Sequence, residues 1–455
     1  MAHHMDKYKN MGENVGGFMN DRREEMVLTS LEPCDHIYAS SHSSAKKGAC
    51  DVIRNIKYIQ AFQSLNIPSS STLNIPNTDV VENILVSVQF NVSLTRIGSP
   101  ANFNIPSGLA WQMVDYIQYT INGSQTYTVA GAELLHFQLL SLETANKRQQ
   151  VLDLAGPADK GNYSTTQASI AQNCDMILNV PALCKLPSFL GSSLPLDCRM
   201  FNNISQVIVY WKQPAKIKFG EDTSNYWTLS IVNNAFTSGR FIVINDTFVD
   251  PNLSLATVLK SDPMATYVHP HTFLQSFTVS LAGEDVSALH TKTISGFRFG
   301  ALTGILLKVY DPDLWKTTNP LSSCEINNLQ VLYNGVTLYN APNRTILLAQ
   351  AVQGLDLPYV PQQIENGNAI NNYLYEVQFS IEDAARESAD VMNGLEIGNN
   401  SLLVQFNGDT SRMSGTTGAG TANSQFGSNA VLQICYLYNC GLVVSQGGAR
   451  CDFIF

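Results

Sequence analysis

An internal repeat constrains the fold of this chain more than any other feature of its sequence. A shift of 212 positions places residues 115–140 on residues 327–352 without a gap, with six identities in 26 positions, where chance gives roughly two. In both copies, apolar and polar residues alternate up to an Asn-Gly pair, at 122–123 and at 334–335. Alternation indicates a half-buried strand, and Asn-Gly favours a two-residue type I′ turn. We therefore predict the same β-hairpin in each half of a chain built from two related β-modules.

The composition favours an all-β protein. Charged residues make up 14% of the 455 residues, against roughly 25% in ordinary soluble domains. Asn, Ser, Thr and Gly are abundant, and β-branched and aromatic residues are spread throughout. Two β-modules of about 200 residues each fit both the length and the repeat offset. Low charge indicates a surface satisfied by neutral hydrogen-bonding groups or by other subunits.

The charge balance argues against nucleic acid as a partner. The formal net charge is -10, whereas neutralising phosphates requires a basic surface. The first 60 residues hold eight basic and eight acidic side chains, so no basic packaging arm is visible. We expect no sequence-specific contact with nucleic acid.

The cysteines and the apolar stretches indicate the compartment. Nine cysteines lack short paired spacings, and residues 1–20 lack an apolar signal core. These features favour reduced thiols in a protein made in the cytosol. The longest apolar stretches, such as 430–444, are interrupted by polar residues and are too short to span a bilayer comfortably.

The chain divides into four parts. Residues 1–54 are polar and without a sustained period, which is typical of an extended arm. Residues 55–255 and 266–455 show strand patterns throughout. The segment 256–265, which is weakly patterned and contains a proline, is predicted to be a linker. Leucine spacing predicts a helix over 131–149 that ends in Lys147 and Arg148, and 407–429 is predicted to be a long surface loop.

Motifs that carry chemistry are few. His269 and His271 lie two apart on a predicted strand, as in the metal sites of cupins, but no carboxylate follows at the spacing such a site needs. Other candidate groups occur in turns, at an unsuitable spacing or in the arm, and we interpret them as structural: Asp311 and Asp313, Glu284 and Asp285, Cys435 and Cys440, and Cys34 and Cys50 with His36 and His42. We predict no catalytic, cofactor-binding or metal-binding residue and no cofactor.

Aromatic residues at strand spacing have two interpretations. They could stack on bases or sugars, but in strands such residues belong far more often to a core or a subunit interface. We favour the second interpretation for the following residues: Tyr116, Tyr119, Tyr127, Trp211 and Trp227.

Two tandem β-modules, each with an Asn-Gly hairpin followed by a short helical segment, resemble the double jelly-roll major capsid proteins. This family includes those of adenoviruses, tailless membrane-containing phages, virophages and nucleocytoplasmic large DNA viruses. A second segment carries the resemblance: Leu-Pro-Ser-Phe and Leu-Pro-Leu-Asp-Cys within 186–198 precede the strand 204–211. The counterpart at 394–406 keeps the strand and lacks the proline.

The resemblance implies two tandem eight-stranded jelly-roll sandwiches with short helices in their loops, and a structural protein instead of an enzyme. It implies homotrimers that form pseudo-hexagonal capsomers in the icosahedral shell of a double-stranded DNA virus. The chain would then be made in the host cytoplasm and located in the virion. The partners implied are neighbouring capsomers, penton and minor capsid proteins, and an internal membrane.

Two other functions stay open on the sequence. One is a double jelly-roll hydrolase directed at glycans, similar to bacterial peptide:N-glycosidases, in which Asp311 and Asp313 would be the acids to test. The other is a carbohydrate-binding or receptor-binding β-protein that would bind through residues 408–429 and the Tyr-rich loops.

Overall fold

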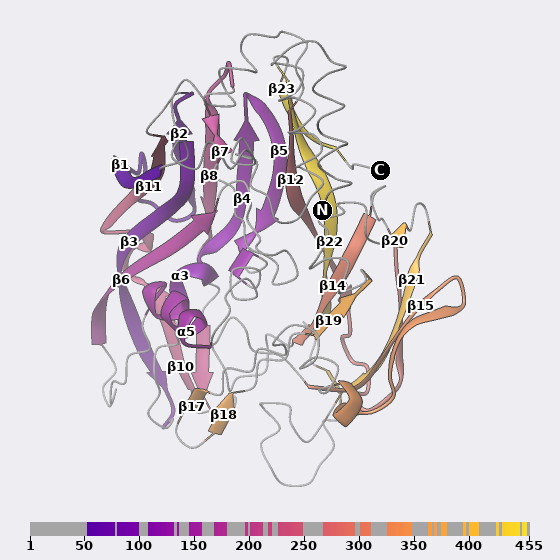
Figure 1. Ribbon diagram of the computed structural model, residues 1–455. Helices are drawn as coiled ribbons and strands as arrows, with labels where there is room; N and C mark the ends of the chain where they lie inside the picture. The colour runs from indigo at the N-terminus through magenta and orange to yellow at the C-terminus, as the bar shows by residue number, and fades with distance from the viewer. Residues whose placement is uncertain are drawn as a thin grey trace, which may run out of the picture.

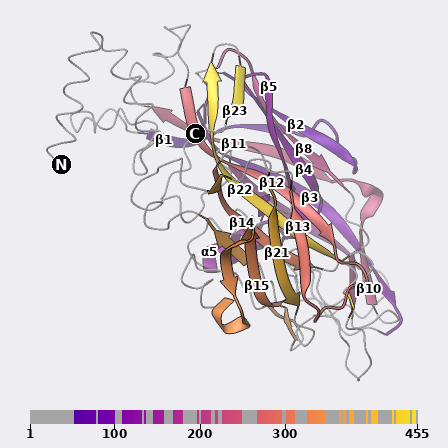
Figure 2. The same cartoon turned by 90° about the vertical axis from the view of Figure 1, so that its right-hand side faces the viewer.

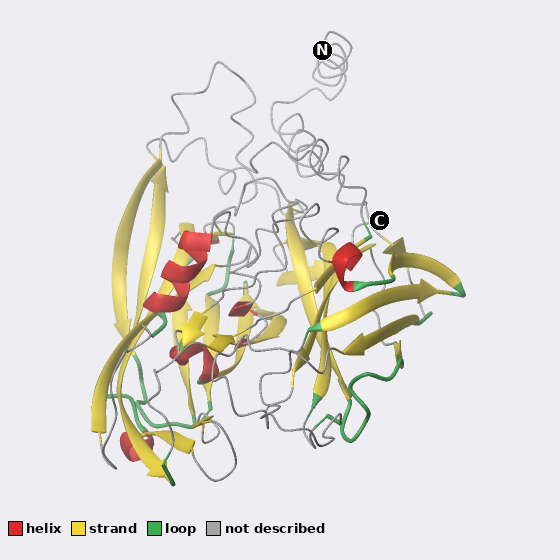
Figure 3. Cartoon of the chain, turned by 90° about the horizontal axis from the view of Figure 1, so that it is seen from below, coloured by secondary structure: helices red, strands yellow, loops and turns green. Residues whose placement is uncertain are grey.

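The computed structural model describes residues 52–452 with gaps, the longest of which are 157–167, 180–195, 249–266, 311–324, 348–362, 380–394 and 409–424. The linker predicted at 256–265 and residues 1–51 of the predicted arm therefore lie outside the described residues, whereas residues 52–54 belong to the first strand, β1 (Val52–Ala61). Strands dominate the described chain (Figure 1), and the helices beside them are short (Figure 3). No described helix has both the length and the apolar character needed to cross a membrane.

The first half of the chain forms two antiparallel sheets. The smaller sheet has four strands in the order β2 (Ser69–Ile75), β8 (Ser205–Trp211), β4 (Val114–Ile121) and β5 (Ser124–Ala130). The larger sheet is built on the long strand β3 (Val80–Ile97), which pairs with the following strands: β11 (Ser238–Phe248), β6 (Ala168–Asn179), β7 (Leu196–Asp197) and β10 (Tyr226–Ile231). β1 (Val52–Ala61) pairs with β11 at one edge, and β9 (Ile217–Gly220) pairs with β10.

The second half repeats this arrangement. Its smaller sheet has the order β13 (His290–Ile294), β21 (Leu402–Gly408), β15 (Ile326–Tyr333) and β16 (Val336–Ala341). Its larger sheet has the order β12 (Tyr267–Ser280), β22 (Val431–Ser445), β14 (Ala301–Tyr310) and β19 (Tyr375–Gln378). Two short strands extend the larger sheet: β20 (Leu395–Glu396) on β14 and β23 (Gly448–Asp452) on β22. A separate two-stranded hairpin joins β17 (Gln363–Glu365) to β18 (Asn368–Ile370).

The two halves have the same topology. Matched in chain order, the core strands β1, β2, β3, β4, β5, β6, β8 and β11 correspond to β12, β13, β14, β15, β16, β19, β21 and β22. Every pairing among these eight strands of the first half has its counterpart in the second half, whereas β9 and β10 have no counterpart among the described strands of the second half. The fold class is confirmed: the chain contains two tandem eight-stranded jelly rolls.

The repeated hairpins agree in detail. Both turn residues have positive φ in each copy, 50° and 77° at Asn122-Gly123 and 49° and 78° at Asn334-Gly335, as a type I′ turn requires. Tyr119 pairs with Tyr127 and Val331 pairs with Tyr339, and the register shifts at the next residue in both hairpins. Because the bulge falls at the same step, the repeat preserves the pairing register as well as the turn.

The segment rich in Leu and Pro also has a counterpart in the structure. Leu196–Asp197 forms β7, which pairs with Val80 and Val81 of β3 just before the chain enters β8. In the second half, Leu395–Glu396 forms β20, which pairs with the start of β14 before β21. The proline is therefore not needed for this strand to form.

Strict alternation places the core residues in both small sheets. Every second residue is buried in β8, from Ser205 to Trp211, and in β21, from Leu402 to Gly408. Within the first core, the indole Nε1 of Trp211 donates a hydrogen bond of 2.9 Å to Oγ of Ser71 on β2. This bond satisfies a buried polar group that the apolar surroundings would otherwise penalise.

One predicted helix boundary is wrong. Helix α5 spans Ala145–Leu154, so Lys147 and Arg148 lie in its first turn and not its last. A separate short helix, α3 (Leu109–Gln112), precedes β4. Leu134 and Leu135 are helical and buried, as the leucine spacing predicted, but residues 136–144 lie outside the described chain. Leucine periodicity located apolar residues correctly without locating the end of the helix.

The two hairpin tips differ in their surroundings. Oδ1 of the buried Asn122 accepts hydrogen bonds from the backbone N–H groups of Asn202 (3.1 Å) and Asn203 (2.9 Å). Its own N–H donates to Oγ of Ser205 at 3.1 Å. Asn334 is exposed. The first tip therefore anchors the segment that leads into β8, whereas the second tip faces solvent.

We expect Asn122→Ala to destabilise the protein by about 1–3 kcal/mol, because it leaves two backbone donors near the core without their acceptor. Asn334→Ala is the matched control, since it makes the same change in the same turn type at an exposed position. Its cost should be well below that of Asn122→Ala. Urea unfolding of both variants measures the difference, and equal losses of stability would contradict this account.

Ser71→Ala should cost about 1–3 kcal/mol, because it leaves the buried indole N–H of Trp211 unsatisfied. The double variant with Trp211→Phe should lose less than the sum of the two single changes, since Phe has no donor to satisfy. A double-mutant cycle by urea unfolding measures the coupling. Strictly additive losses would show that the hydrogen bond contributes nothing.

Candidate functional site

The metal candidates do not assemble into a site in the described part of the chain. His269 and His271 lie on β12, but their side chains are outside the described residues. Asp311 and Asp313 and the candidates of the arm (Cys34, His36, His42 and Cys50) also lie outside them. Among the side chains that the structure does describe, no three His, Cys, Asp or Glu residues lie close enough together to hold a metal ion.

The described cysteines are buried. Cys435 lies inside β22, and Cys440 is also on this strand, with its side chain outside the described residues. Burial raises the pKa of the Cys174 thiol to about 12, and Asp175 adds to this effect. Because the thiolate is the reactive form, Cys174 is unreactive near neutral pH.

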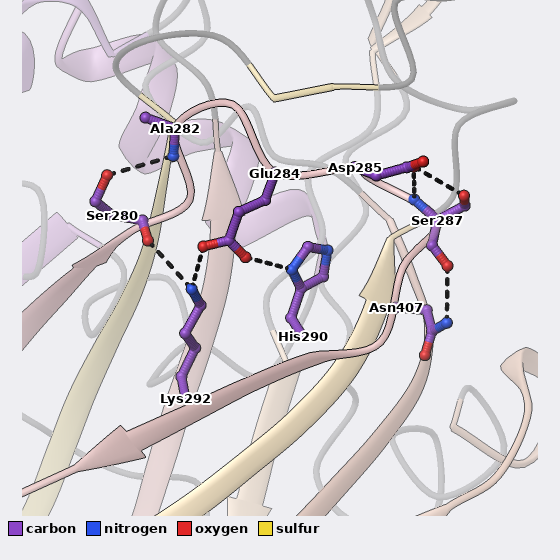
Figure 4. Close-up of polar contacts among 8 residues, drawn as sticks. All are labelled: Ser280, Ala282, Glu284, Asp285, Ser287, His290, Lys292 and Asn407. Atoms are coloured by element: carbon purple, nitrogen blue, oxygen red, sulfur yellow. Dashed lines mark hydrogen bonds and ion pairs between the residues drawn. The ribbon is translucent and has the colours of Figure 1, made fainter.

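Glu284, which we interpreted as a turn residue, belongs to a cluster of charged side chains (Figure 4). Its Oε2 lies 2.7 Å from Nδ1 of His290, and its Oε1 pairs with Nζ of Lys292. His290 is buried on β13, where the centroid of its ring lies 5.0 Å from the ring centroid of Phe406 and 5.5 Å from that of Phe426. The cluster therefore ties the turn after β12 to the second core.

Backbone bonds hold the same turn from its other side. Gly283 N–H donates to Phe426 O, and Phe426 N–H donates to Glu284 O, at 3.1 and 2.9 Å. Asp285 Oδ1 accepts bonds from the N–H and Oγ of Ser287, both at 2.9 Å (Figure 4). Phe426 is buried within the segment 407–429 predicted to be a surface loop. Its lone aromatic side chain was the signal that the prediction overlooked.

The electrostatics of Glu284 fit a structural carboxylate. Burial acts to raise its pKa, but the hydrogen bonds and charges of Lys292 and His290 outweigh burial, and the pKa of Glu284 is lowered. A general acid near neutral pH needs a raised pKa. The cluster therefore holds an ionised carboxylate in an ion pair and is not poised for proton transfer.

The aromatic candidates divide between the core and the surface of the first small sheet. Tyr119 and Trp211 are buried. Tyr116 stacks on Tyr210 with ring centroids 4.1 Å apart and planes 20° apart. The side chains of Tyr127 and Trp227 lie outside the described residues. Tyr119 and Trp211 confirm the core interpretation, and the rings of Tyr116 and Tyr210 already stack on each other.

The two jelly rolls meet along one edge of the first small sheet. Strand β5 lies beside β23, and β12 also approaches it, so that the second jelly roll covers the outer edge of the first (Figures 1 and 2). β4 approaches β23 as well. The sequence did not indicate this contact, because β23 lies more than 300 residues after β5.

Glu284→Gln should change how stability depends on pH. The folded pKa of Glu284 is below its ordinary value of 4.5, so its ion pairs stabilise the fold above about pH 4.5, and this contribution is lost as the pH falls through the lowered pKa. The difference in urea midpoint between wild type and Glu284→Gln should therefore shrink as the pH is lowered from about 5 through the lowered pKa of Glu284. Asp285→Asn is the neighbouring control. A constant difference across this range would rule out the ion pairs as its cause.

Comparison with known proteins finds solved structures with a similar fold but no matching family model or curated sequence. Among solved structures, a chain of the PBCV-1 virus capsid aligns with a TM-score of 0.57 and 11% identity, over 89% of this chain and 98% of that chain.

Two further capsid proteins align over similar lengths. The mavirus major capsid protein aligns with a TM-score of 0.55 and 12% identity, over 88% of this chain and 90% of its own. The Faustovirus major capsid protein aligns with a TM-score of 0.53 and 10% identity, over 94% of this chain and 98% of its own. These alignments extend across both jelly rolls. The chain has the double jelly-roll fold of viral major capsid proteins.

Proposed function

We propose that this chain is the major capsid protein of a double-stranded DNA virus, a structural subunit of an icosahedral shell. The observation that carries the proposal is the repeated topology: two eight-stranded jelly rolls, joined in one chain, match each other strand for strand. Solved capsid proteins align with nearly the whole chain, so the likeness does not rest on one shared module.

We propose that three copies associate into a pseudo-hexagonal capsomer. Three chains with two equivalent modules each have six similar lobes around a threefold axis, and such an outline packs into a flat facet with few kinds of contact. Closed sandwiches suit this role, because packing and pairing limit the exposed strand edges through which chains aggregate.

The composition supports extended contacts between subunits. Only 14% of the residues are charged, and interface cores are depleted in charge because desolvating unpaired charges is costly. The net charge of -10 does not suit a surface that condenses nucleic acid. The charge therefore fits a shell protein whose main partners are other proteins.

The division of the chain follows from this role. We propose residues 55–255 and 266–455 as the two jelly-roll domains, with 256–265 as the linker. Residues 1–54 would serve as an arm that contacts neighbouring capsomers, penton or minor capsid proteins, or an internal membrane. The balanced charge of the first 60 residues suits such contacts better than genome binding. In this proposal the protein is made in the host cytoplasm, is located in the virion and has no catalytic role.

The purified protein should have a solution mass of roughly 150 kDa, three times the 49.9 kDa of one chain. Light scattering coupled to size-exclusion chromatography measures this mass, and electron microscopy should show particles with a pseudo-hexagonal outline. A chain that stays monomeric at all concentrations would contradict the proposal. A monomer that binds glycans, or that cleaves glycopeptides, would favour the alternative functions.

A further inference from the structure

The outer edge of the second small sheet is uncovered in the described chain. β16 is the last strand of this sheet, and no described element other than β15 packs extensively against it. Its residues Val336 and Leu338 are 62% and 36% exposed, and Ile346, just beyond the strand, is also exposed. Residues 336–341 carry no charged side chain. An apolar, uncharged edge strand is a site at which another chain can pack.

The equivalent edge of the first small sheet shows what covers such a strand. β5 has the same place in its sheet as β16, with the same turn and the same bulge. In that copy β23 of the following jelly roll lies beside the edge strand, and β12 of the same jelly roll approaches it. Within one chain, the edge of the first small sheet therefore contacts the second jelly roll. Figure 2 shows the second small sheet on the side facing the viewer, with β13, β21 and β15 in front.

In a ring of copies such as the trimer proposed above, the module that would follow the second jelly roll is the first jelly roll of another copy. The counterpart of β12 in the first jelly roll is β1, since each is the edge strand that pairs with the last long strand of its own larger sheet. β1 exposes an apolar side chain of its own, because Ile59 is 57% exposed. Leu65, which follows this strand, is also exposed. The chain therefore has two edge strands with exposed apolar side chains, β16 in the second jelly roll and β1 in the first. By the internal repeat, they are the counterparts of β5 and β12.

We propose that β16 of one copy packs against β1 of a second copy, so that β1 takes the place beside β16 that β12 takes beside β5 within one chain. This inference rests on the trimer proposed above and names the surfaces that form it. The contact is heterologous, because the two surfaces differ. Such contacts close into a ring of three chains when each copy is related to the next by a threefold rotation. Both surfaces are then buried in every copy.

Charge substitutions on the two edges test the assignment. Leu338→Glu and Ile59→Glu each place a carboxylate on one edge, and both positions are exposed in the single chain, so the fold should be retained. Leu154→Glu is the matched control, because Leu154 is 44% exposed on α5, away from both edges. We expect both edge variants to be monomers at concentrations at which wild type and Leu154→Glu are trimers. Circular dichroism and thermal unfolding verify folding, and Val336→Glu and Leu65→Glu provide second variants of the two edges.

Mixing the two edge variants gives the sharper test. Ile59→Glu keeps an intact β16 edge and Leu338→Glu keeps an intact β1 edge, so the mixture can form one good contact and no closed ring. We expect heterodimers of roughly 100 kDa in the mixture, and monomers in each variant alone. Light scattering of the mixture and of both separate samples provides the measurement.

The possible outcomes separate this inference from the proposed function. If wild type is a trimer and the edge variants remain trimers, the surfaces are wrongly assigned and the capsomer proposal stands. If the variants are monomers but their mixture stays monomeric, β16 and β1 do not meet each other, and the inference is overturned. If wild type itself is a monomer, both the trimer and this surface assignment fail.

Discussion

The pairing register of the antiparallel strands is the constraint on which the rest of this structure depends. A slip of one residue would exchange the core face and the solvent face along a whole strand. In each jelly roll, an Asn-Gly turn with two positive φ angles and a bulge at a fixed step set the register of one hairpin. The neighbouring strands β8 and β21 then pair with these hairpins and present every second residue to the core.

Equivalent positions in the two jelly rolls have taken on different polar chemistry. Ser71 pairs with Val209 and His290 pairs with Phe406, so both lie at the same place in their small sheets. Ser71 accepts a hydrogen bond from Trp211, whereas His290 bonds to Glu284. At the position equivalent to Trp211, the second jelly roll has Gly408, where an added Cβ would lie 2.7 Å from Val286. The topology is conserved between the halves while each core is filled in its own way.

The two hairpins have also diverged, because the first lies at a contact within the chain and the second lies at the surface. The first hairpin tip is buried against residues 202–205, and its edge strand lies against the second jelly roll. The second hairpin keeps the turn and the bulge, but its tip and edge are exposed. A repeated unit within one chain needs one contact between its copies, and the corresponding unused edge is then available to another chain.

The sequence by itself determined the class of fold and its duplication, because the two-residue alternation and the Asn-Gly turns are local properties of the chain. The segments 186–198 and 394–406, which the resemblance paired, hold the equivalent short strands Leu196–Asp197 and Leu395–Glu396 in the structure. The sequence did not determine where α5 ends, because leucine spacing reports burial and not helix capping. Only the tertiary structure revealed the Glu284, His290 and Lys292 cluster, the burial of Phe426 and the cover that β12 and β23 give to β5. Each of these depends on contacts between segments that local periodicity does not connect, since which sheet edges meet is decided when the sandwiches pack.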